Sequence, residues 1–127
     1  MPISTYAGNA VLNALFNNTA LQVATPHISL HTGDPGLTGA SEVTAGGNSY
    51  ARQTGSFGSP SSKAIANDAA PEWEDMPAVT VTHVGVWDAA TDGNFLWGGA
   101  LGSSKATNAG DTFTLPVGDL DIEFDPA

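Results

Sequence analysis

Residues 79–97 read VTVTHVGVWDAATDGNFLW, and this stretch decides the fold class. In its first half, β-branched residues alternate with their neighbours as far as Trp87, which is the two-residue period of a β-strand. Asp92-Gly93 then provides a turn, and Phe95-Leu96-Trp97 starts a second apolar run. Because a short turn joins the two runs, we predict an antiparallel β-hairpin.

Shorter patterns of the same kind occur on both sides of the hairpin. Ile28 and Leu30 alternate with polar side chains, which predicts a strand with one buried face. Two runs near the C-terminus alternate likewise and indicate a further pair of strands joined by a turn. We therefore expect strands over residues 27–31, 50–57, 112–115 and 120–124.

One helix is expected, at the N-terminus. Apolar residues recur there at helical spacings of three and four, and Ser4 or Thr5 can cap the first turn. Gly8 weakens this helix, and Asn17-Asn18 ends it, so we expect it to depend on packing against another element. The apolar positions are Ala7, Ala10, Val11, Ala14 and Leu15.

Together these elements predict a mainly β protein. We expect an antiparallel β-sandwich or a jelly-roll-like barrel of about seven or eight strands with one N-terminal helix. The length fits a single domain over residues 1–127. Within it, residues 1–20 form a helix or arm and residues 21–127 form the β-sandwich.

Composition and charge exclude several classes of protein. Only 13% of the 127 residues are charged and 41% are hydrophobic, which argues against an intrinsically disordered chain. The net charge is −10, and the only cations, Arg52, Lys63 and Lys105, are scattered, so no nucleic-acid partner is expected. No apolar run is long enough to span a membrane, and no membrane partner is expected. Cysteine is absent, which excludes thiol catalysis and cysteine-based zinc sites.

The sequence predicts no catalytic residue, no cofactor and no metal. His27 and His31 share a strand face but lie ~13 Å apart at about 3.3 Å per residue, and His83 belongs to another strand. The run Gly55-Ser56-Phe57-Gly58-Ser59 lacks the spacing of a nucleophile elbow. No glycine-rich phosphate-binding loop is present either, so we expect no enzyme.

The last predicted strand is acidic on one face. Three interpretations stay open: a solvated face that protects a sheet edge, a docking face for a basic partner, or a calcium site. The four carboxylates that alternate along it are Asp119, Asp121, Glu123 and Asp125.

Two other features are candidate interaction sites. Trp87 and Trp97 lie in predicted strands and are expected in the core, whereas Trp73, flanked by glutamates, is a candidate exposed interface anchor. Arg52 is the only arginine, and we expect an ion pair within the chain, with Glu42 or Asp34 as its partner.

Six short motifs occur in order along nearly the whole chain. They are LNALF at 12–16, LHTGDPG at 30–36, SYARQ at 49–53, THVGVWD at 82–88, GNFLW at 93–97 and GDTF at 110–113. In this ordered set the chain resembles a family of short bacteriophage virion proteins described as tail fibre, minor tail or head-decoration proteins. This resemblance implies a structural role in the virion.

The resemblance leaves three functional hypotheses. The main one is a capsid decoration (cement) protein, a symmetric oligomer and preferably a trimer, that binds the major capsid protein on the outside of the head. The alternative is a tail fibre, minor tail or baseplate component that contacts the tail or a host receptor. A carbohydrate-binding module is the third. The first two place the protein, made in the host cytoplasm, on the head surface or the tail of the virion.

Overall fold

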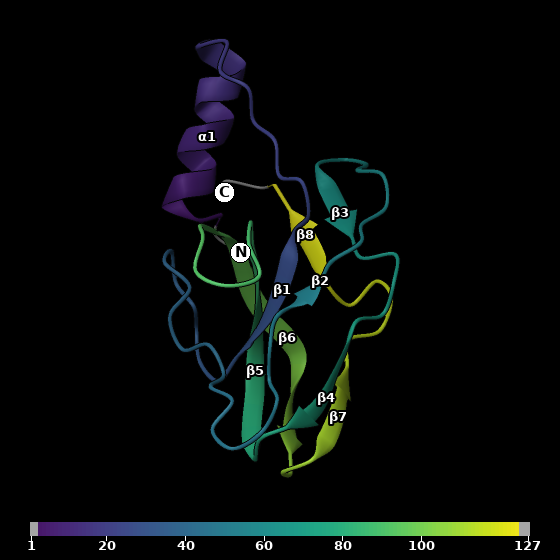
Figure 1. Cartoon of the computed structure of the whole chain (residues 1–127). Coiled ribbons are helices and arrows are strands. Elements are labelled where there is room, and N and C mark those ends of the chain that lie inside the picture. The colour runs from purple at the N-terminus through teal and green to yellow at the C-terminus, as the bar shows by residue number, and fades with distance from the viewer. Residues whose placement is uncertain (1–2, 125–127) are drawn as a thin grey trace.

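The computed structural model describes residues 3–124, and Figure 1 shows its arrangement. The prediction of a mainly β protein with one N-terminal helix is confirmed. Within the described residues, the elements follow in the order α1 (Thr5–Phe16), β1 (His27–His31), β2 (Gln53–Thr54), β3 (Ala64–Ala66), β4 (Glu72–Met76), β5 (Val79–Trp87), β6 (Phe95–Thr107), β7 (Asp111–Thr114) and β8 (Asp121–Glu123).

All the strand pairs are antiparallel, and they form three sheets. The largest has four strands in the order β2-β1-β5-β6, while β3 pairs with β8 and β4 pairs with β7. Both ends of the four-stranded sheet are open, so the strands between residues 3 and 124 do not close into a barrel.

The hairpin predicted over residues 79–97 is formed by β5 and β6. Asp92 and Gly93 in its turn adopt positive φ angles of 53° and 78°, the conformation that an Asp-Gly pair favours. The Asp88 carboxylate closes the loop by accepting hydrogen bonds from the Asn94 backbone N–H (2.7 Å) and side-chain amide (2.9 Å). β6 continues as far as Thr107, well past the predicted apolar run, because its small and polar residues pair with the first half of β5.

β1 lies between β2 and β5, and both of its faces are buried. The prediction of a single buried face is therefore wrong. Ser29 and His31 point away from Ile28 and Leu30, yet they are also fully buried. The Trp87 ring and the loop over residues 32–49 cover that second face, through the hydrogen bonds described below.

The two C-terminal strands exist, but they do not pair with each other as predicted. β7 pairs with β4, and β8 pairs with β3. Asn67 holds the connection between them in a shape that separates the strands. Its amide donates to the Pro116 carbonyl oxygen (3.0 Å), and its side-chain oxygen accepts from the backbone N–H groups of Gly118 and Leu120 (both 3.0 Å).

The hydrophobic core joins the four-stranded sheet to the β4–β7 ribbon. Trp87 and Trp97 are 9% and 5% exposed, which agrees with the prediction that both are buried. Trp73 from β4 meets Phe113 from β7 edge to face, with 5.7 Å between ring centroids. The cluster consists of Ile28, Leu30, Val43, Trp73, Met76, Val81, Val84, Val86, Trp97, Phe113, Leu115 and Leu120.

The helix α1 begins as predicted. Ser4 is its N-cap, and the Ser4 hydroxyl oxygen accepts a hydrogen bond from the Ala7 backbone N–H at 3.0 Å. None of the twelve helical residues is buried, and Figure 1 shows α1 extending beyond the sheets. Across residues 3–124, no helix combines the length and the apolar character needed to cross a membrane.

Candidate assembly interface

α1 is attached to the rest of the protein at its base. The Ser4 backbone N–H donates to the Leu96 carbonyl oxygen at 2.9 Å, and Ile3 forms an antiparallel bridge with Trp97. These contacts hold the start of the helix against β6. The rest of α1 runs away from the four-stranded sheet, at ~1.5 Å per residue, so its last turn lies far from this attachment.

The last turns of α1 expose three large apolar side chains. Leu12, Leu15 and Phe16 are 55%, 69% and 76% exposed, and their spacing of three and four places them on one stripe of the helix. We call these three residues the apolar tip. Single exposed apolar residues are common on proteins, but three together at the end of a projecting helix are typical of a contact site.

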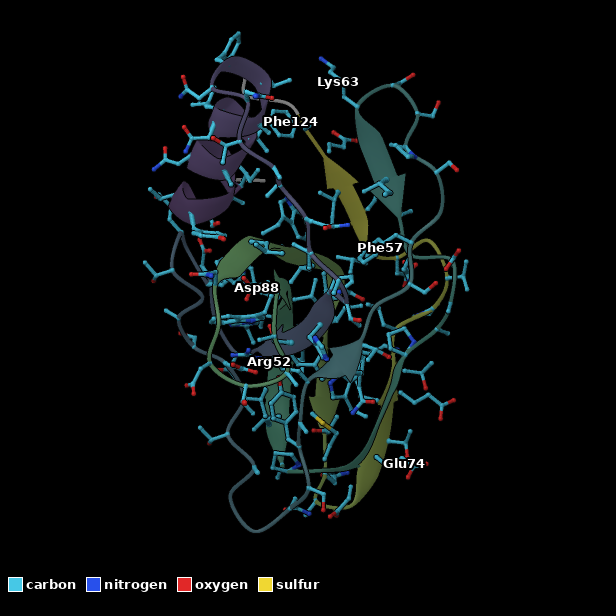
Figure 2. The ribbon with its side chains drawn as sticks, turned by 45° about the horizontal axis from the view of Figure 1, so that its top comes forward. Arg52, Phe57, Lys63, Glu74, Asp88 and Phe124 are labelled. Atoms are coloured by element: carbon cyan, nitrogen blue, oxygen red, sulfur yellow. The ribbon has the colours of Figure 1, made fainter. Side chains whose placement is uncertain are left out.

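An apolar groove lies next to the base of α1. It has a volume of about 240 Å³ and is formed where α1, the four-stranded sheet and the β3–β8 pair meet. Figure 2 shows Phe124, which is 47% exposed, between β8 and α1. Glu123 is the one charged residue among those that line it. The lining residues are Ile3, Ala7, Pro26, Phe57, Ile65, Val86, Leu96, Trp97, Ile122, Glu123 and Phe124.

Charge is distributed unevenly between the N-terminal part and the rest of the chain. The first charged residue in the sequence is Asp34, so α1 and the segment that leads from it into β1 carry none. The whole net charge of −10 therefore belongs to residues 34–127. A contact made by α1 would rely on apolar burial and not on ion pairs.

A second site surrounds Arg52, whose side chain is almost completely buried. Two guanidinium nitrogens donate to the Glu42 carboxylate at 2.9 and 3.0 Å, forming a bidentate ion pair. The guanidinium also lies 3.7 Å above the centre of the Trp87 ring and donates to the carbonyl oxygens of Ala89 and Asp92. Figure 2 shows Arg52 beside the loop that connects β5 to β6.

Of the two carboxylates expected to pair with Arg52, Glu42 is the one that it reaches. Asp34 instead accepts a hydrogen bond from the Gly36 backbone N–H at 2.9 Å. This contact forms the tight turn after β1, where Gly36 has a φ of 61°. The Asp34 carboxylate therefore stabilises this turn, and Glu42 pairs with Arg52.

Tyr50 extends the Arg52 site toward β1. Its hydroxyl donates to Glu42 at 2.8 Å and accepts from the Leu30 backbone N–H at 3.0 Å. Burial, together with the nearby Glu42 charge, raises the pKa of Tyr50 far above its usual value, so the hydroxyl keeps its proton. Tyr50 and Arg52 are two residues apart, and both side chains donate to the Glu42 carboxylate.

Ser29 and His31 complete the site at the edge of the Trp87 ring. The Trp87 indole N–H donates to the Ser29 hydroxyl oxygen at 2.9 Å, and that hydroxyl lies 2.6 Å from His31 Nε2. Because the Ala40 carbonyl oxygen, 2.7 Å from Nδ1, can only accept, the His31 proton is on Nδ1 and Ser29 donates to Nε2. Burial lowers the pKa of His31, so the ring is neutral at pH 7.

We call Ser29, His31, Glu42, Tyr50, Arg52 and Trp87 the Arg52 cluster. It holds the loop over residues 32–49 and the loop over residues 88–94 against the sheet. The hydrogen bonds stay within the protein, and we assign the cluster a structural role. Three of the six motifs that carry the resemblance, at 30–36, 49–53 and 82–88, supply residues of the cluster. Phe95, from the motif at 93–97, packs against the Trp87 ring with 5.1 Å between ring centroids.

Trp73 does not lie where an exposed interface anchor would have to be. It is 0% exposed, because alternation along β4 turns its ring inward while the flanking Glu72 and Glu74 point to solvent. The interpretation of Trp73 as an exposed anchor is therefore wrong. Burial also leaves the indole nitrogens of Trp73 and Trp97 without hydrogen-bond partners among the described residues.

The acidic face of the last strand is only partly within the structure. Asp121 and Glu123 lie exposed on β8, Asp119 lies exposed in the preceding turn, and Asp125 is outside the described residues. Over residues 3–124, no group of three His, Asp or Glu side chains could hold a metal ion together. Whether this face docks a basic partner stays a prediction.

The class that the fold defines is a small β-rich protein, with loops fixed against its main sheet and a projecting helix that exposes apolar side chains. The chain belongs to the family described as Podophage GP4 fiber I protein gp80, which matches residues 2–123. No curated protein matches the chain significantly. The family is one of phage fibre proteins and not of enzymes, so the predicted structural role in the virion is confirmed. It supports the tail-fibre alternative better than the capsid-decoration hypothesis.

Proposed function

We propose that this protein is a tail-fibre subunit that joins the virion through α1. The observation that carries the proposal is the apolar tip, whose three side chains are all at least 55% exposed. Burying a Leu or Phe side chain contributes about 1.5–3 kcal/mol, so a partner that covered two of them would gain several kcal/mol. Fibre proteins assemble with other proteins of the tail, and an uncovered apolar helix end is suited to such a contact.

Incorporation into phage particles tests this proposal. The variant L15S/F16S removes apolar surface from two exposed positions and should leave the fold intact. We expect purified particles that carry this variant to contain at least about tenfold less of the protein than wild-type particles, because each lost contact is worth more than 1.4 kcal/mol. Quantitative mass spectrometry of purified particles, with the major capsid protein as internal standard, measures the ratio.

The matched control is V117S, since Val117 is 60% exposed in the loop between β7 and β8 and is not part of the apolar tip. This variant should enter particles in wild-type amounts. A normal content of the L15S/F16S variant would contradict the proposal. The same measurement gives the copy number per particle, which is tens for a fibre protein and hundreds for a capsid decoration protein.

Receptor contact is a second, compatible role. The loop over residues 34–48 is fixed by the Arg52 cluster, and a pre-ordered loop binds with a smaller entropic cost than a mobile one. By contrast, all three tryptophans are at most 9% exposed, which disfavours a sugar-stacking platform and with it the carbohydrate-binding alternative. The trimeric state and the particular tail partner stay predictions.

A further inference from the structure

We infer that the apolar tip of one copy of this protein binds the apolar groove of a second copy. The inference rests on the proposed function, in which α1 is a contact element, and it adds the partner: another copy of the same chain. Each copy carries both a tip and a groove, so the contact can be repeated between subunits of a fibre.

None of the three tip residues lines the groove of its own copy. Ile3 and Ala7, at the base of α1, form part of the groove wall. Leu15 is two turns further along the helix than Ala7, which is ~12 Å at about 1.5 Å per residue. Figure 1 shows α1 extending from its base beyond the sheets, so its own tip would reach the groove lining only if α1 were broken. A tip that fills this groove must come from another molecule.

The charges favour a second copy over a basic partner. Two molecules of net charge −10 repel each other, and they approach most easily through surfaces without charge. The tip belongs to an uncharged segment, and Glu123 is the one charged residue of the groove lining. A basic partner would instead be attracted to exposed carboxylates such as those of Asp119 and Asp121, outside the groove lining.

The sizes of the two surfaces also agree. The groove is apolar, open to solvent and about 240 Å³ in volume, which is enough for one or two side chains and not for a whole helix. The tip offers three side chains on a single stripe at the end of a helix. A reciprocal exchange closes a two-fold dimer, and a head-to-tail exchange closes a ring such as a trimer.

The test measures self-association of the purified full-length chain by sedimentation velocity over a range of concentrations. L15D places a charge on the tip, and F124K places the opposite charge in the groove. Both positions are substantially exposed, so the fold should tolerate either change, which thermal melting can verify. We expect the wild type to associate and each single variant to associate at least about 100-fold more weakly, since a charge would enter an apolar contact.

The double variant L15D/F124K provides the decisive result. It has the net charge of the wild type, and in any symmetry each Asp at the tip faces a Lys in the groove of the next copy. We expect it to recover at least about tenfold of the lost association constant. V117D is the matched control, because it adds the same negative charge as L15D at an exposed apolar position elsewhere and should associate like the wild type.

Three results would overturn the inference. The first is a wild-type chain that remains monomeric up to about 0.5 mM, which corresponds to a contact weaker than about 4.5 kcal/mol. The others are an L15D variant that associates as well as the wild type and a double variant that recovers none of the lost association. The particle experiment separates this inference from the proposed function. If the wild type is monomeric while L15S/F16S is lost from particles, α1 binds a different tail protein and only this inference fails. If self-association is as expected but L15S/F16S enters particles normally, the proposed function fails.

Discussion

The Arg52 cluster and α1 represent opposite ways of holding a segment that lies outside the main sheet. In the cluster, two long loops are fixed by an ion pair, a cation–π contact and a chain of hydrogen bonds that continues into β1. Within residues 3–124, the backbone bonds between α1 and the sheet lie at the base of the helix, and its largest apolar side chains face solvent. The comparison shows that polar side chains fix the loops against the sheet, whereas the apolar side chains at the end of α1 stay exposed and are available for contact with another molecule.

The largest expected effect is that of R52M. This change leaves the partly buried Glu42 carboxylate without its partner, and breaking a buried ion pair in this way costs about 3–5 kcal/mol. Because Met also loses the bonds to Ala89 and Asp92, the loop after β5 should become mobile. Urea unfolding measures the free energy of unfolding, and K63M, at an exposed lysine, is the control. A loss below about 1 kcal/mol would mean that the cluster does not fix the loops.

G85A tests how tightly the cluster is packed. An added Cβ would lie 2.7 Å from the Ser29 hydroxyl oxygen and 2.8 Å from His31 Nε2, two atoms that hydrogen bonds already hold. We expect a loss of about 1–3 kcal/mol in the free energy of unfolding. At Gly102, on β6, a Cβ would meet no atom within 4 Å, so G102A should be nearly neutral. Equal effects of the two changes would contradict this account.

His31 makes the stability of the cluster depend on pH. Burial lowers the pKa of His31 in the folded protein, whereas the unfolded chain takes up a proton near the ordinary value of 6.5. The unfolded state therefore binds more protons below that value, and the free energy of unfolding should fall with decreasing pH, by at most about 1.4 kcal/mol per pH unit. Above pH 7 this contribution is constant.

Comparing variants isolates the contribution of His31. H31Q should weaken the dependence between pH 7 and pH 5, a range above the titration of ordinary carboxylates at about 4. H27Q, at a half-buried histidine on the same strand, should retain the dependence. Chemical denaturation at several pH values gives the slopes, and an unchanged slope in H31Q would assign the dependence to other groups.

The smallest effect on stability is expected at α1. L15S/F16S should change the free energy of unfolding by less than about 0.5 kcal/mol, since both side chains are mostly exposed in the isolated protein. The same kind of change at Leu115, which is 1% exposed, should cost at least about 2 kcal/mol. If L15S/F16S were strongly destabilising, α1 would belong to the folded core and would not be free for contact.

Much of the fold could be predicted where local rules and tertiary packing agree. The hairpin of β5 and β6 has a regular alternation and an Asp-Gly turn, and Ser4 caps α1 by a purely local hydrogen bond. The second half of β6 was missed because its glycines and serines have little strand preference, and only pairing with β5 makes them a strand. In this half of β6, pairing within the sheet outweighs the low intrinsic strand propensity of the residues.

β4 shows why the candidate site was harder to predict than the fold. Trp73 and Met76 are three residues apart, yet both are fully buried, which a regular strand does not allow. A bulge between them restores the inward direction, and Asp75 within it has a φ of 51°. Asn48 and Ser49, far away in the sequence, donate to the Asp75 carboxylate and support this conformation. No pattern within β4 contains that information.

Of the contacts in the Arg52 cluster, the sequence analysis predicted only the ion pair of Arg52, with Glu42 or Asp34 as its partner. The bond from Tyr50 to Glu42 and the bonds of Ser29 and His31 depend on segments that meet only in the folded protein. The two-residue spacing of Tyr50 and Arg52 was the available signal, because within a strand such a spacing places both side chains on the same face. Exposure of the tip was likewise beyond sequence analysis, since an apolar helix stripe more often faces the core of its own chain.

Because no charged side chain precedes Asp34, a contact made by α1 should depend on ionic strength in a particular way. Contacts built on ion pairs weaken as ionic strength rises, because salt screens their attraction. A contact made by an uncharged helix end on a protein of net charge −10 responds in the opposite way: salt screens the repulsion between the acidic parts and leaves the apolar attraction in place. The affinity of such a contact therefore increases with ionic strength, which suits a particle that leaves its host.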